Sequence, residues 1–177
     1  MRRACVSLAF SAGLLVLAAA GSSAKAAVDV GQPAPPLAVE ELNGKPFDLG
    51  ALRGKVVIVN YWATWCPPCR AEMPALDAFY RRYHDRGVEL IGLSADVPRE
   101  RDAARKMMEA YAYPAAMMRD ARPNGFGRPT ALPITYVIDA QGVVRAKLQP
   151  DETGVTEQSL AAAVLPLLPQ DKPKATP

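Results

Sequence analysis

Residues 57–74 read VIVNYWATWCPPCRAEMP, a β-branched run that leads into two closely spaced cysteines. Val and Ile without polar alternation are typical of a strand buried on both faces. A helical pattern begins near Pro67 and continues to about Arg86, where Gly87 is a stop signal. The chain therefore carries a C-x-x-C pair at the point where a buried strand gives way to a helix.

This position of the cysteines favours redox chemistry. Cys66 falls at the helix start, where unpaired N–H groups and the positive end of the helix dipole stabilise a thiolate. We predict Cys66 as the exposed attacking thiol, and Cys69, one turn further on, as the resolving thiol of a redox-active disulfide. A bridge across two residues constrains the unfolded chain little, and two cysteines cannot complete a four-thiolate zinc site. The alternative is an inert bridge or a pair of buried thiols.

Strands and helices alternate along the rest of the chain. This alternation predicts parallel strands, and a final hairpin makes the sheet mixed. The expected fold is α/β: a mixed central β-sheet flanked by helices, with an N-terminal β-hairpin extension that turns at Asn43-Gly44. Asp96 is a candidate cap for the second helix. The predicted strands are residues 37–39, 47–49, 55–61, 88–94, 115–118, 134–138 and 143–148, and the predicted helices are residues 67–86, 98–111 and 156–165.

The first 26 residues have the features of a secretory signal. A basic start at Arg2-Arg3 precedes an uncharged, apolar run over residues 4–24, and Ala24-Lys25-Ala26 fits the small-x-small cleavage rule. An uncleaved membrane anchor is the alternative, because the run is long enough to span a bilayer. Cleavage before Ala27 would remove Cys5 and place the remaining pair in a periplasmic or otherwise extracytoplasmic compartment, where disulfides persist.

The charge balance argues against one class of partner. The chain has 21 basic and 18 acidic residues, and the three surplus basic residues all lie within residues 1–26. A nucleic-acid-binding protein normally keeps a basic surplus in its folded part, so no nucleic-acid partner is expected. We expect one folded domain over residues 27–168 and a disordered, Pro-rich tail over residues 169–177.

Two segments, residues 57–74 and LPITYVID (residues 132–139), resemble the thioredoxin superfamily and, more narrowly, the TlpA/ResA-type extracytoplasmic thiol–disulfide oxidoreductases. The resemblance covers about residues 31–168. It implies a thioredoxin-like fold and an enzyme that exchanges thiols with partner proteins. It also implies that a redox-active disulfide takes the place of a metal or other cofactor.

The resemblance places a substrate-binding surface beside the dithiol. Pro133 matches the family's cis-proline, which would free the backbone of Leu132 to pair with an extended substrate segment. Pro129 is a rival for the cis position, and Trp65 is expected to form an exposed apolar rim. The residues expected to bind substrate are Trp65, Pro67, Pro68, Leu132 and Pro133.

Glu72 matches the family's acidic residue three positions after the second cysteine. It would exchange protons with the Cys69 thiol, although a solvated helix carboxylate is the alternative. Asn60 stands where cytoplasmic thioredoxins carry a titrating Asp, and an amide cannot titrate. Pro68 lacks an N–H, so the Cys66 thiolate should have one donor fewer and the couple should be more reducing.

The expected function is reduction of disulfides in exported proteins, with apocytochrome c or the thiols of a copper site as candidate substrates. The protein is expected to act as a monomer and to be re-reduced by a membrane-embedded thiol donor, because the compartment lacks the cytosolic thiol pool.

Two other classes stay open. A copper-binding or metallochaperone protein of this fold would need C-x3-C and a distal His, whereas the single His84 is expected to be exposed at a helix end. Met107-Met108 and Met117-Met118 are interpreted as core packing, with one side chain of each pair turned inward. A peroxidase of this fold usually has Thr three residues before its cysteine, where this chain has Ala63.

Overall fold

The computed structural model describes residues 28–150 and 155–169. The predicted signal segment, and all of the predicted tail except Pro169, lie outside these residues. Within the described ranges, no helix is long and apolar enough to cross a membrane.

The central sheet has five strands in the order β5-β4-β3-β6-β7. Strand β3 (Val56–Trp62) lies in the middle, where it pairs parallel with β4 (Val88–Ser94) and antiparallel with β6 (Ile134–Ile138). Strand β5 (Ala115–Met117) adds a parallel edge and β7 (Val144–Leu148) an antiparallel one. The prediction of a mixed sheet is confirmed.

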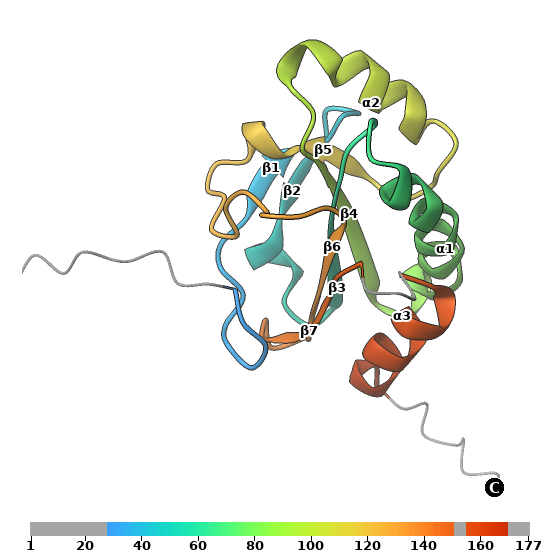
Figure 1. Cartoon of the computed structure of the whole chain (residues 1–177). Helices are drawn as coiled ribbons and strands as arrows, with labels where there is room; N and C mark the ends of the chain where they lie inside the picture. The colour runs from blue at the N-terminus through green and yellow to red at the C-terminus, as the bar shows by residue number, and fades with distance from the viewer. Residues whose placement is uncertain (1–27, 151–154, 170–177) are drawn as a thin grey trace, which may run out of the picture.

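Three helices accompany the sheet (Figure 1). Helix α1 (Pro67–Tyr83) follows β3, and a short 3-10 turn carries it to Gly87, whose φ of 89° closes the helix. Helix α2 (Arg101–Met108) is shorter than the predicted 98–111, because residues 98–100 form a 3-10 turn and the α-helix already ends at Met108. Helix α3 (Glu157–Val164) packs beside α1.

The two faces of the sheet bury separate cores, which explains why β3 shows no polar alternation. Ile58 and Trp62 point into the core beneath α1 and α3. Val57 and Val59 point into a second core on the opposite face. Because both faces are covered, every residue of β3 is buried.

The N-terminal hairpin covers the second face. Strands β1 (Ala38–Glu40) and β2 (Pro46–Asp48) pair antiparallel and turn at Gly44, whose φ of 85° suits glycine. The N–H of Leu42 donates to the carbonyl oxygen of Ala115 at 2.7 Å, which attaches the hairpin to the edge strand β5.

Two local expectations are wrong. Asp96 does not cap the second helix: Val97 precedes the 3-10 turn, Glu100 is the N-cap residue of α2, and Asp96 is buried. Met117 and Met118 are both buried rather than one of them, because they face opposite cores.

Candidate active site

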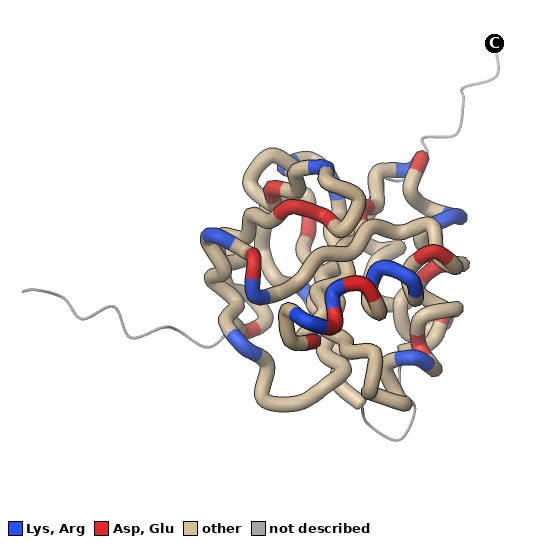
Figure 2. The backbone as a smooth tube through the Cα atoms, turned by 90° about the horizontal axis from the view of Figure 1, so that it is seen from above, with Lys and Arg blue, Asp and Glu red and all other residues tan. Residues whose placement is uncertain are grey.

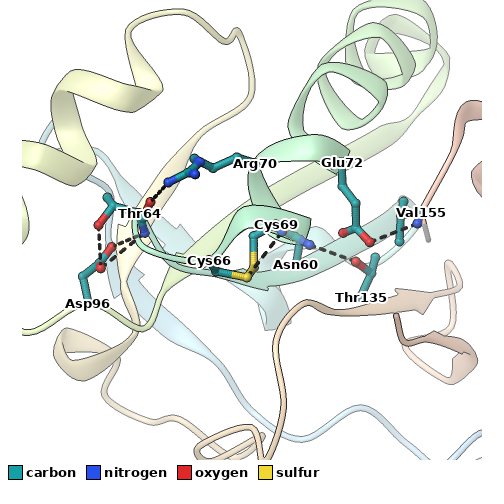
Figure 3. Close-up of a disulfide and its surroundings, with 9 residues drawn as sticks. All are labelled: Asn60, Thr64, Cys66, Cys69, Arg70, Glu72, Asp96, Thr135 and Val155. Atoms are coloured by element: carbon teal, nitrogen blue, oxygen red, sulfur yellow. Dashed lines mark hydrogen bonds between the residues drawn. A yellow bond between two sulfur atoms is a disulfide. The ribbon is translucent and has the colours of Figure 1, made fainter. Parts of the chain in front are cut away.

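The two cysteines form a disulfide at the start of α1. Cys66 is the N-cap residue, and its Sγ accepts a hydrogen bond from the N–H of Cys69 at 3.3 Å (Figure 3). The Cα atoms of the pair lie 5.3 Å apart. Pro67 and Pro68 fill the first two helical positions and have no N–H to donate. Within the described residues, the Cys69 N–H is therefore the one backbone donor to this sulfur.

The expectation of an exposed Cys66 needs correction. Only 4% of the residue is accessible, and Cys69 is 1% accessible. The reason is that Trp65 and the segment 128–132 close around Cys66 and leave it at the wall of a cavity of about 420 Å³. The sulfur is therefore reached through this recess, which we call the disulfide cavity. Its lining residues are Trp65, Cys66, Pro67, Pro68, Ala95, Met118 and residues 128–132.

The structure brings most of the expected substrate-binding residues together. Trp65 is 62% exposed at the rim of the disulfide cavity, whereas Trp62 is fully buried. Leu132 lines the cavity from the opposite loop, and the Leu132–Pro133 peptide bond is cis, whereas the bond before Pro129 is not among the cis bonds of the described residues. Pro133 itself is buried behind this lining.

Glu72 is buried on the inner side of α1, so the alternative of a solvated helix carboxylate is wrong. Its Oε1 accepts a hydrogen bond from the N–H of Val155 at 3.0 Å (Figure 3), and its Oε2 has no hydrogen-bond partner in the described part of the chain. Burial raises the pKa of Glu72 from 4.5 to about 7, against the opposing effect of the Val155 hydrogen bond. The carboxyl group therefore changes charge near neutral pH.

Two other buried polar side chains lie in the same interior. Asn60 of β3 donates from Nδ2 to the hydroxyl of Thr135 at 2.9 Å. Tyr113, which sequence reasoning missed, is buried with its hydroxyl unpartnered among the described residues. Burial, followed by Tyr111, Asp77 and Glu72, raises the pKa of this phenol. No sequence signal marks Tyr113, because only its position in the core distinguishes it from other tyrosines.

The turn before Cys66 is held from two sides. Asp96 accepts from the N–H of Thr64 at 3.0 Å, from the Thr64 hydroxyl at 2.9 Å and from the Ser94 hydroxyl at 2.7 Å. From α1, Arg70 donates to the carbonyl oxygen of Thr64 at 2.8 Å. Both contacts fix the backbone that presents Cys66 (Figure 3).

No group of three or more His, Cys, Asp and Glu side chains suitable for a metal ion occurs in residues 28–150 and 155–169. His84 follows the C-terminal end of α1, opposite the end that holds the disulfide, and its ring packs against Tyr80.

A mixed sheet, with a C-x-x-C disulfide at the N-terminus of the helix that follows its central strand, defines a thioredoxin-like thiol–disulfide oxidoreductase. Comparisons with known proteins agree with this assignment. Residues 30–147 match the model of the AhpC/TSA family, and the chain belongs to that family. Proteins of this class work through a redox-active disulfide rather than a separate cofactor.

Among the relatives, the protein named thiol-disulfide oxidoreductase ResA of Bacillus anthracis is 35% identical over 132 residues, which cover 73% of this chain and 75% of that protein. ResA of Bacillus subtilis (strain 168) is 31% identical over 122 residues, which cover 68% of this chain and 67% of that protein.

Solved structures show the same fold. A thioredoxin-family thiol:disulfide interchange protein from Chlorobium tepidum TLS superposes with a TM-score of 0.64 at 29% identity, covering 78% of this chain and 97% of the other. A secreted thiol-disulfide isomerase from Corynebacterium glutamicum superposes with a TM-score of 0.63 at 26% identity, covering 76% of this chain and 84% of the other.

Proposed function

We propose that this oxidoreductase reduces disulfides of exported proteins through Cys66 and Cys69. The observation that carries the proposal is the Cys66 sulfur, which lies at a helix N-terminus in the wall of a cavity that also exposes Leu132. A substrate segment in this cavity would bring its disulfide to Cys66 while its backbone runs along Leu132.

The reaction transfers two electrons from the reduced enzyme. The Cys66 thiolate attacks one sulfur of the substrate disulfide, forms a mixed disulfide and releases the other sulfur as a thiolate. The Cys69 thiolate then attacks the Cys66 sulfur, which releases the second substrate thiolate and leaves the enzyme disulfide. Glu72 accepts the proton that Cys69 loses, and the substrate thiolates take up protons as they leave.

Two features of the site support these roles. Glu72 lies one turn beyond Cys69 on α1, and its pKa of about 7 allows it to hold or release a proton near neutral pH. The Cys66 sulfur has the Cys69 N–H as its backbone donor, because Pro67 and Pro68 offer none. A thiolate with fewer donors is less stabilised, which makes the dithiol a better reductant.

The setting of the reaction belongs to the same proposal. The signal-like segment of residues 1–26 supports export, and the related Corynebacterium isomerase is described as secreted. An exported reductase needs a source of electrons, and a membrane-embedded thiol donor is the expected one. Apocytochrome c and the thiols of a copper site are the candidate substrates of a monomeric enzyme.

Reduction of insulin disulfides tests the activity. The reduced protein should accelerate insulin reduction, and Cys66→Ser should abolish the acceleration. Equal rates for the two proteins would remove the reductase proposal.

Trapping then tests the substrates. Cys69→Ala cannot resolve the mixed disulfide, so it should retain exported proteins on Cys66 that a reducing agent releases. Recovery of copper without any protein adduct would contradict the proposal and favour the copper-binding class.

A further inference from the structure

A second cavity, of about 260 Å³, adjoins the disulfide cavity. The two cavities share Met118 and Arg128 in their walls, so they lie side by side. The remaining lining residues of the second cavity include two more arginines and no acidic side chain. We call it the arginine cavity, and its lining residues are Met118, Arg119, Arg122, Asn124, Gly127 and Arg128.

The three arginines have no carboxylate partner within the described ranges. Asp120, the acidic residue between them in the sequence, is bonded instead to Arg101 of α2. Arg122 donates to the carbonyl oxygens of Arg119 at 2.8 Å and Ala121 at 2.7 Å, and it also borders a neighbouring cavity that Asp120 lines. All three guanidinium groups therefore keep their charge, and within the described residues no side-chain hydrogen bond holds those of Arg119 and Arg128.

Hydrogen bonds hold the loop that lines the arginine cavity. Asn124 accepts from the N–H of Gly127 at 3.0 Å and donates to the carbonyl oxygen of the same residue at 3.3 Å. These bonds close the turn that presents Arg128. Elsewhere along the backbone, basic and acidic positions are interspersed (Figure 2), and from residue 27 onward the chain has 18 of each. The arginine cavity is thus a local surplus in a balanced chain.

We infer that the arginine cavity binds carboxylate side chains of the substrate polypeptide, so that the enzyme prefers disulfides flanked by acidic residues. The inference rests on the proposed function, in which a polypeptide occupies the disulfide cavity. A chain bonded to Cys66 continues along the shared wall at Arg128 and reaches Arg119. Guanidinium groups suit this ligand because their planar donors match the two oxygens of a carboxylate.

Two matched peptides test the inference. Each contains one disulfide to a fluorescent reporter, with Glu on both sides of the cysteine in one peptide and Gln in the other. The wild-type enzyme should reduce the Glu peptide with a kcat/KM about three- to tenfold higher, the range expected for two solvent-accessible ion pairs. Added salt should narrow this ratio.

The double variant Arg119→Gln/Arg128→Gln should lose the preference and reduce the two peptides at equal rates. Arg81→Gln/Arg82→Gln is the control, because it removes the same charge near the C-terminal end of α1. It should keep the preference for the Glu peptide.

Three outcomes would overturn the inference. The first is a preference that survives in Arg119→Gln/Arg128→Gln, and the second is an equal loss with both peptides. The third is binding of anionic lipid vesicles to the wild type but not to this double variant, together with equal wild-type rates for the two peptides. In each of these outcomes the wild-type enzyme still reduces insulin. By contrast, a wild-type enzyme that reduces neither peptide nor insulin would remove the proposed function itself.

Discussion

Replacing Glu72 by Gln should make the protein more stable at high pH. The carboxyl group is buried, with one oxygen bonded to the Val155 N–H and the other unpartnered among the described residues. Gln has almost the same shape and keeps an oxygen that accepts the Val155 N–H, but it never ionises. The substitution therefore removes the cost of a buried negative charge with little change in packing.

The magnitude follows from the pKa of Glu72, which is about 7 in the folded protein and 4.5 without burial. The folded state binds the proton more tightly, so stability is greatest below pH 4.5 and falls as the pH rises through about 7. At about 1.4 kcal/mol for each pH unit, the loss reaches about 3 kcal/mol. Glu72→Gln should escape this loss.

Urea unfolding of the oxidised proteins, measured between about pH 4 and pH 9, gives the two stability profiles. All other carboxyl groups are common to both proteins, so their contributions cancel in the difference. The difference should grow by about 3 kcal/mol across this range in favour of Glu72→Gln. Parallel profiles would show that Glu72 titrates as an ordinary carboxyl group, and the proton-exchange role would lose its physical basis.

Three further substitutions probe the surroundings of the disulfide. Pro68→Ala supplies an N–H to the Cys66 thiolate, so the potential measured against glutathione should become more oxidising by about 30 mV; an unchanged potential would contradict the donor argument. Gly92→Ala places a Cβ 2.9 Å from the Trp62 ring nitrogen, and urea unfolding should show a loss of about 1–3 kcal/mol, which an unaltered midpoint would exclude. Asp96→Ala removes the acceptor that holds the turn before the disulfide and should cost about 2 kcal/mol in the same assay, whereas a negligible loss would mean that the turn is held by other contacts.

The sequence predicts the sheet well where the apolar runs are long. Residues 56–62 and 88–94 are rich in Val, Ile and Leu and almost wholly buried, and their strands lie within one residue of the predicted bounds. The short strands β1 and β2 are displaced by one residue from 37–39 and 47–49, because three residues carry no measurable periodicity.

The site is predictable only where it depends on local sequence. The C-x-x-C motif locates the disulfide, because the helix start and the cysteine spacing are encoded within a few residues. The burial of Cys66 and Glu72 depends on segments that return much later in the chain. The hydrogen bond from Val155 to Glu72 joins residues 83 positions apart, and Asp96 reaches Thr64 across 32 positions. Such contacts have no signature in a single sequence.

The positions of the two tryptophans make the redox state visible without a label. The exposed indole of Trp65 is next to a disulfide, which quenches fluorescence on contact, whereas Trp62 lies in the sealed interior. Opening the bridge should therefore raise the tryptophan fluorescence of the protein, to which Trp62 also contributes from the core that it shares with both cysteines. Each turnover of the enzyme can then be followed as a change in tryptophan fluorescence.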